Sequence, residues 1–145
     1  MLDKLLQGVE VRSLVGDGTV AVGRLEFDSR KVVPDTLFFA TRGTQADGHA
    51  YIPAAVAAGA AAVVCEELPA ERPVGVTFVQ VPDSTVALGQ VASAFYGHPS
   101  RRLKLVGVTG TNGKTTTATL LYRMFRRLGY KAGLISTVVY CVDER

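Results

Sequence analysis

The chain has 145 residues, of which 48% are hydrophobic and 20% are charged, and its formal net charge is +3. These values are typical of a soluble globular protein that builds a hydrophobic core without metals or disulfides. Its two cysteines, Cys65 and Cys141, are too few for a disulfide framework and lack zinc-site spacing, which suits a reducing cytoplasm. Length alone predicts a single domain.

The basic residues form only one cluster, Arg123, Arg126 and Arg127, at the end of a predicted helix, where cations offset the helix dipole. This favours a solvated helix face over a nucleic-acid surface. The uncharged stretch 50–65 is shorter than the roughly 20 residues of a membrane span. We therefore expect a cytoplasmic protein with no signal peptide and with neither a nucleic-acid nor a membrane partner.

The first hundred residues alternate between strand-like and helix-like segments. The expected strands are 20–27, 36–40, 61–65 and 76–81, and the expected helices are 53–59 and one that opens at 82–84. The apolar residues of the second helix lie mainly on one face, and they are Val86, Leu88, Val91, Ala92 and Phe95. This alternation predicts an α/β domain over residues 1–100.

A second segment, 103–145, reads as one strand–loop–helix–strand unit. We expect a buried strand at 103–108, a glycine-containing turn at 109–114, a helix at 115–128 capped by Gly129, and a strand at 131–139. One stripe of the helix is apolar, and it consists of Leu121, Met124, Phe125 and Leu128. This unit begins a second domain, so two domains replace the one that the length predicts.

The strongest chemical signal is the stretch 107–116, GVTGTNGKTT, in which a strand leads through a turn into a helix N-terminus. Unpaired backbone N–H groups and the helix dipole favour an anion there. Gly110 and Gly113 let the backbone curl around phosphate oxygens, Lys114 supplies a cation, and the Thr115 hydroxyl suits Mg²⁺. The alternative is a tight turn with a surface lysine.

The strict phosphate-loop pattern requires glycine at position 108, where this chain has Val108. The stretch 109–116 resembles the ATP loop of the Mur ligases, the amide-forming enzymes of peptidoglycan precursor synthesis, whose loop also lacks that glycine. Folylpolyglutamate synthases carry a similar loop. A phosphate-loop kinase or motor is a weaker interpretation, since an α/β domain precedes the loop.

The N-terminal segment distinguishes among these families. Its motifs at 28–30 (DSR), 33–35 (VPD), 37–40 (LFFA), Gly43 and 47–49 (DGH) resemble the uridine-nucleotide-binding domain shared by the third and fourth Mur ligases. The linker 96–100 and the loop resemble the branch that adds the third peptide residue, and the D-Ala-D-Ala-adding branch is the alternative. The resemblance extends from about residue 28 to residue 137.

The resemblance implies two sets of site residues. The set implied to contact the UDP moiety of the substrate is Phe27, Ser29, Arg30, Thr44, Gln45 and Ala46. The set implied to hold ATP is Gly110, Thr111, Asn112, Gly113, Lys114, Thr115 and Thr116, with Lys114 and Thr115 in catalysis and Thr115 on Mg²⁺. From the residues alone, 28–30 is instead an Asx turn with a surface arginine.

The implied reaction is ATP-dependent amide formation. ATP phosphorylates the D-glutamate carboxylate of UDP-MurNAc-L-Ala-D-Glu, and the amine of diaminopimelate or lysine then displaces phosphate. Only 30 residues follow Thr115, so we expect no ligase activity from this chain alone. A non-catalytic UDP-nucleotide-binding module is the alternative function.

The apolar stripe of the helix at 115–128 is expected to self-associate, to pack on the first domain or to be mobile. His49 and His98, each beside glycine or proline, are interpreted as loop residues without a ligand role. Cys65 is expected in the core.

Overall fold

The computed structural model describes residues 1–43 and 46–142. The chain forms two compact units, Met1–Leu103 and Lys104–Arg145, and each is described by itself. Both contain helices and strands, which confirms the predicted α/β class.

The first unit is built on a five-stranded sheet with the order β1-β5-β4-β3-β2. Its strands are β1 (Ser13–Val15), β2 (Arg24–Glu26), β3 (Thr36–Phe39), β4 (Ala60–Cys65) and β5 (Thr77–Gln80). Strands β2 to β5 are parallel, with Glu26 opposite Phe38, whereas β1 pairs antiparallel to β5. The carboxyl ends of β2 to β5 therefore meet at one edge of the sheet.

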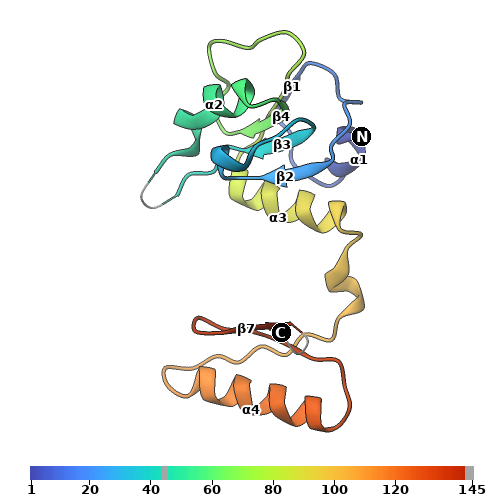
Figure 1. The fold of residues 1–145 in the computed structure, drawn as a ribbon, viewed down its shortest axis with the longest axis vertical. Coiled ribbons are helices and arrows are strands. Elements are labelled where there is room, and N and C mark those ends of the chain that lie inside the picture. The colour runs from blue at the N-terminus through green and yellow to red at the C-terminus, as the bar shows by residue number, and fades with distance from the viewer. Residues whose placement is uncertain (44–45, 143–145) are drawn as a thin grey trace. The chain divides into compact units, whose positions relative to one another are not determined.

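Helices cover both faces of this sheet (Figure 1). They are α1 (Leu2–Leu5), α2 (Ile52–Ala57) and α3 (Ser84–Phe95), with the 3-10 turns η1 (Ser29–Lys31), η2 (Gly48–Tyr51) and η3 (Pro99–Arg102). Alternate strand residues face opposite ways, so Phe39 packs on the side of α1 and α3, and Phe38 on the side of α2. The result is a three-layer domain.

The predictions for the first unit are confirmed in part. Cys65 lies in the core as expected, where it is fully buried, and burial raises the pKa of its thiol to about 11. The strand expected at 20–27 is shorter and begins only at Arg24. The helix face expected in α3 is partly wrong, because Ala87 and Val91 enter the core whereas Val86 is 55% exposed.

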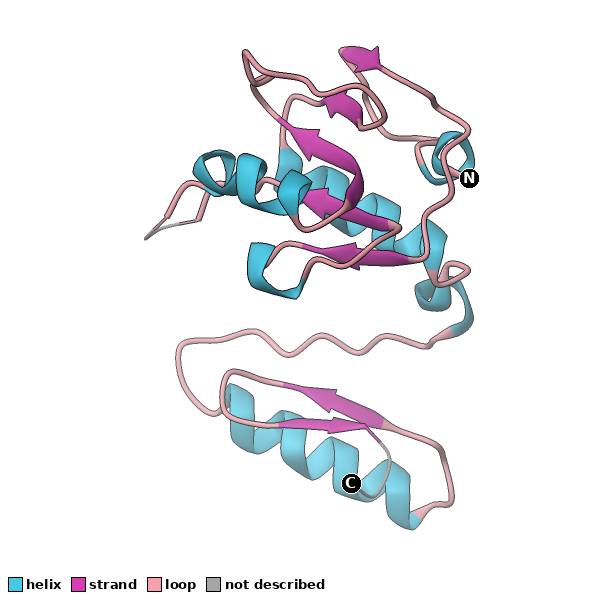
Figure 2. Ribbon diagram, turned by 45° about the horizontal axis from the view of Figure 1, so that its top comes forward, coloured by secondary structure: helices cyan, strands magenta, loops and turns pink. Residues whose placement is uncertain are grey.

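The second unit packs α4 (Lys114–Arg127) against a hairpin of β6 (Gly133–Ile135) and β7 (Tyr140–Val142), as Figure 2 shows. Leu134 is its buried residue. Gly129, with φ +84°, ends α4 as predicted, and Tyr130 N–H donates to Phe125 O at 3.0 Å, which closes a Schellman motif.

Two strand predictions in the second unit are wrong. Residues 103–108 are extended but form no strand, because β6 pairs with β7 and no described strand pairs with this stretch. The expected strand 131–139 is interrupted at Ser136, whose hydroxyl accepts hydrogen bonds from the amides of Val138 and Val139. These two amides bond locally to the turn instead of joining a ladder.

The predicted apolar stripe of α4 is only partly covered by this hairpin. Met124 and Leu128 are 45% and 64% exposed, while Leu121 and Phe125 are half-buried. Self-association through this stripe stays a prediction.

Candidate functional site

The predicted phosphate loop ends at a helix N-terminus that no side chain caps. Gly113 is the N-cap of α4 with φ +77°, and the first helical turn carries no acidic residue. A side chain at this φ is strained, so glycine is required by the backbone conformation. The first-turn amides are therefore available to an anion.

The loop backbone also leaves open space where a phosphate would approach. A Cβ built at Gly113 meets no atom within 4 Å, and one built at Gly110 lies 3.7 Å from Asn112 O. Gly110 has φ +147°, a conformation that L side chains rarely adopt. Backbone shape, and not crowding, explains both glycines.

Lys114 turns its side chain back over the loop. Its ammonium donates to the backbone oxygen of Gly110 and, at 3.2 Å, to that of Thr111. The cation therefore lies at the mouth of the loop, on exposed residues. Thr115 follows it in the first turn of α4 and is half-buried. Amides, an ammonium and a hydroxyl on one loop are donors that fit a nucleoside triphosphate with its Mg²⁺.

The residues predicted to contact UDP follow two neighbouring strands, β2 and β3, at the edge where the parallel strands end (Figure 1). Phe27 directly follows β2 and is 64% exposed. Ser29 and Arg30 form η1, and Ala46 lies between β3 and η2. Thr44 and Gln45 lie outside the described residues. Ligands of open α/β sheets bind at this edge.

The turn at 28–30 has the Asx geometry that the alternative interpretation expected. Asp28 accepts from the backbone N–H of Arg30 at 3.1 Å and from its guanidinium through both carboxylate oxygens, each at 2.9 Å. The hydrogen bond from the Arg30 side chain, and to a smaller extent the one from the Arg30 amide, lowers the pKa of Asp28 to about 2. The Arg30 side chain is 87% exposed, so it is anchored yet accessible.

The motif Asp47-Gly48-His49 has a geometric explanation. Asp47 accepts from the backbone N–H of His49 at 2.9 Å and contacts its Nδ1 at 2.6 Å. The hydrogen bond from the His49 amide, and to a smaller extent the one with its side chain, lowers the pKa of Asp47. A Cβ at Gly48 would lie 2.6 Å from Thr41 O and 2.7 Å from Thr41 N, so only glycine fits there.

His49 does more than a loop residue would. Its Nε2 accepts the backbone N–H of Glu66 at 2.9 Å and that of Glu67 at 3.4 Å. These bonds join η2 to the residues that follow β4. Because Nε2 accepts, Nδ1 carries the proton and donates to Asp47. The His49 side chain is only 15% exposed.

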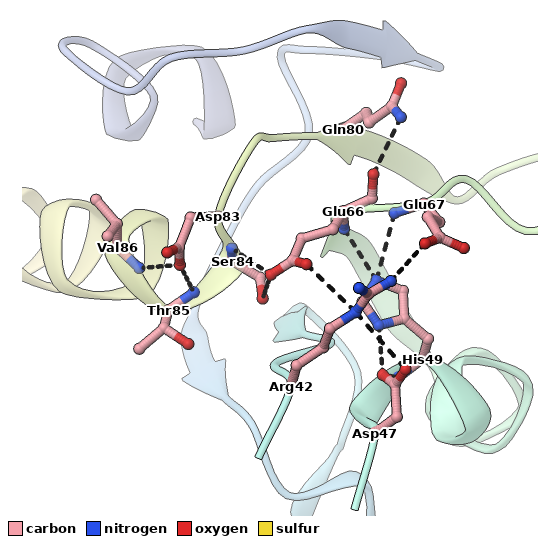
Figure 3. Close-up of polar contacts among 10 residues, drawn as sticks. All are labelled: Arg42, Asp47, His49, Glu66, Glu67, Gln80, Asp83, Ser84, Thr85 and Val86. Atoms are coloured by element: carbon pink, nitrogen blue, oxygen red, sulfur yellow. Dashed lines mark hydrogen bonds and ion pairs between the residues drawn. The ribbon is translucent and has the colours of Figure 1, made fainter. Parts of the chain in front are cut away.

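Arg42 completes a polar network at the same edge, as Figure 3 shows. Its guanidinium pairs with Asp47 at 3.7 Å, with Glu66 at 3.3 Å and with Glu67. Hydrogen bonding to Glu67 is the main cause that raises the pKa of Arg42.

Glu66 extends this network to α3. Its Oε1 accepts from the Ser84 amide at 3.1 Å and from the Ser84 hydroxyl at 2.9 Å, and Ser84 is fully buried. Sequence reasoning missed Arg42, His49 and Glu66 as a group, because 17 or more residues separate His49 from Glu66. The available signal was a charged residue close to the end of each of β3 and β4, since Arg42 lies shortly after Phe39 and Glu66 directly follows Cys65.

Within residues 1–43 and 46–142, no group of three or more His, Cys, Asp or Glu side chains could hold a metal ion. In the same part of the chain, no helix has the length and apolar character needed to cross a membrane.

Comparisons with known proteins match both units. Residues 22–96 match the family model "Mur ligase family, catalytic domain", and residues 108–144 match "Mur ligase middle domain". A UDP-N-acetylmuramoyl-L-alanyl-D-glutamate--2,6-diaminopimelate ligase of Bacteroides thetaiotaomicron is 51% identical over all of this chain, and one of Bacteroides fragilis is 54% identical over 99% of it. The chain spans about 30% of the length of each relative.

Solved structures agree in fold. MurF from Acinetobacter baumannii superposes on 88% of this chain and 28% of its own, with a TM-score of 0.68 and 25% identity. MurF ligase from Thermotoga maritima in complex with ADP covers 72% of this chain and 23% of its own, with a TM-score of 0.54 and 29% identity.

Proposed function

The chain belongs to the Mur ligase family, and on that premise we propose that it forms the nucleotide-binding part of an ATP-dependent ligase. That ligase adds diaminopimelate to UDP-MurNAc-L-Ala-D-Glu during peptidoglycan precursor synthesis. The names of relatives that are 51% and 54% identical to this chain favour diaminopimelate over lysine.

The uncapped N-terminus of α4 carries this proposal. Amides of the loop 110–116 and the Lys114 ammonium bind the phosphates, and the Thr115 hydroxyl holds Mg²⁺. Bound ATP supplies the phosphoryl group that activates a carboxylate. The chain's own residues orient that group and offset its negative charge, which is the main protein contribution to phosphoryl transfer.

In the first unit, Ser29, Arg30 and Ala46 contact the uridine diphosphate of the second substrate. Their support is the shared sheet edge and the accessible guanidinium of Arg30. Phe27, also exposed there, offers its backbone to the same nucleotide. Thr44 and Gln45 belong to this set by family resemblance alone.

We place the protein in the cytoplasm, because two of its three substrates, ATP and UDP-MurNAc-L-Ala-D-Glu, are nucleotides and both cysteines are free thiols. This chain alone is expected to bind and not to catalyse.

Calorimetric titration of the 145-residue chain tests the proposal. UDP-MurNAc-L-Ala-D-Glu is expected to bind, Mg-ATP to bind more weakly, and no amide to form when diaminopimelate is added. CMP-sialic acid, a pyrimidine nucleotide sugar of different base and sugar, serves as the control ligand. Equal binding of both nucleotide sugars, or amide formation by this chain, would contradict the proposal.

A further inference from the structure

We propose that His49 and Glu66 are positioning residues that hold Ala46 in place for the uridine nucleotide, an inference that rests on the proposed function. They do so by tying the segment after β3 to the end of β4 and the start of α3. Neither residue needs to touch the substrate.

The first tie runs from η2 to β4. His49 Nε2 accepts the Glu66 amide at 2.9 Å, while its other ring nitrogen contacts Asp47 at 2.6 Å. One half-buried imidazole thus joins two segments 17 residues apart. Asp47 directly follows Ala46, so a shift of Asp47 displaces Ala46 as well.

The second tie runs through Glu66 and Arg42. One carboxylate oxygen of Glu66 holds the buried Ser84 at the start of α3, and the other pairs with Arg42. Arg42 pairs in turn with Asp47, both by charge and by an antiparallel backbone bridge. The interactions close a ring from β3 through β4 and α3 back to the loop (Figure 3).

The loop itself transmits this restraint. The Gly43 amide donates to Ala46 O at 2.9 Å, and the Gly48 amide to Thr41 O at 2.8 Å. Ala46 is therefore held by a backbone bond to Gly43, and the ring holds the neighbouring residues Arg42 and Asp47. Arg42 and Asp47 are exposed and Glu66 is half-buried, so the charged residues of the ring lie at the edge of the sheet and not in its core.

The test measures the affinity of the 145-residue chain for UDP-MurNAc-L-Ala-D-Glu by calorimetry. His49→Ala removes the acceptor and is expected to lower affinity about tenfold, whereas His49→Gln keeps a non-titrating acceptor and stays within about threefold of wild type. Glu66→Gln keeps the Ser84 bonds, loses the charge pair with Arg42 and weakens affinity by about threefold to fivefold. Glu67→Gln, at a 75% exposed carboxylate, is the matched control and binds like wild type.

Rescue by the conservative variant separates positioning from general stability, because His49→Gln is expected to restore the affinity that His49→Ala loses. Hydrogen exchange of the Glu66 amide in each variant reports whether the tie is broken.

Two results would overturn the inference. One is wild-type affinity in His49→Ala while exchange shows the Glu66 amide unprotected; the other is an equal loss of affinity in His49→Ala and His49→Gln. If wild type itself fails to bind the nucleotide, the proposed function fails and the positioning role fails with it. Should His49→Ala not fold, His49→Gln and Glu66→Gln still decide the outcome.

Discussion

Two helices of this chain follow strands or extended segments, yet their N-termini are finished in opposite ways. At α3, Asp83 accepts from the amides of Thr85 and Val86 at 2.8 and 2.9 Å, and Glu66 accepts from the Ser84 amide. At α4, the N-cap is Gly113, the first turn has no acid, and the nearest side-chain charge is the Lys114 ammonium.

The difference teaches how one local structure serves two purposes. Both N-termini present amides that have no partner within the helix, and both are the positive end of the helix dipole. Carboxylates of the chain itself neutralise α3, which makes it a structural element. At α4 the first turn carries no acid and the N-cap Gly113 has no capping side chain, so that terminus is suited to a phosphate from solution.

The largest effect is expected from opening the closed terminus. Glu66→Ala leaves the buried amide and hydroxyl of Ser84 without an acceptor, so the free energy of unfolding should fall by about 2–3 kcal/mol. Urea denaturation measures it. Glu67→Ala, which removes an exposed partner of Arg42, should cost less than about 0.5 kcal/mol. Equal losses of unfolding free energy in the two variants would show that the Glu66 carboxylate does not stabilise the N-terminus of α3.

Removal of the cation at the open terminus should have the next largest effect. Lys114→Ala is expected to weaken Mg-ATP binding about tenfold in calorimetry at low salt, because a charge-assisted phosphate contact is lost. The thermal midpoint should not change, since the side chain is exposed and its hydrogen bonds among the described residues go to its own loop. Lys131→Ala, another exposed lysine of the same unit, is the control; unchanged ATP binding in Lys114→Ala would argue against the phosphate loop.

The backbone of the open terminus gives a smaller effect. Gly113→Ala forces a side chain into φ +77° and should destabilise α4 by about 1 kcal/mol, seen as faster amide exchange in its first turns. Gly107→Ala is matched to it, because a Cβ there also meets no atom within 4 Å but no positive φ is required. Similar exchange in both variants would show that the left-handed N-cap is unimportant.

The smallest effect concerns Asp28, whose carboxylate accepts from the Arg30 amide at the start of η1. Its pKa lies at about 2 against 3.8 without partners, so its stabilising contribution is complete above 3.8 and is lost as the pH falls through about 2. Carboxyl NMR should give that midpoint. In Arg30→Ala the midpoint should rise toward 3.8, and Arg24→Ala should leave it in place.

These two termini also show what the sequence could predict. The loop 110–116 and helix α4 were predictable because glycines, lysine and the helical stripe are adjacent in the chain. Strands β3 and β4 were predictable because both are largely apolar runs between turns. Residues 103–108 are also mainly apolar, but a strand needs a neighbour, and the sequence pattern does not supply one.

The polar ring lay beyond sequence reasoning for a related reason. Arg42 and Glu66 follow different strands, β3 and β4, and the parallel crossover alone brings them together. His49 looked unremarkable because its function depends on the Glu66 amide, a backbone group with no sequence signature. Only part of the α3 capping could be predicted from the sequence, since Asp83 directly precedes the helix but Glu66 follows β4.

The most direct test of the comparison is one titration of the ¹⁵N-labelled 145-residue chain with Mg-ATP, following the amides of both termini together. The account predicts that amides of Gly110, Gly113, Lys114 and Thr115 shift with a common binding curve while those of Ser84, Thr85 and Val86 do not move. Shifts at the α3 amides, or none at the α4 loop, would contradict it.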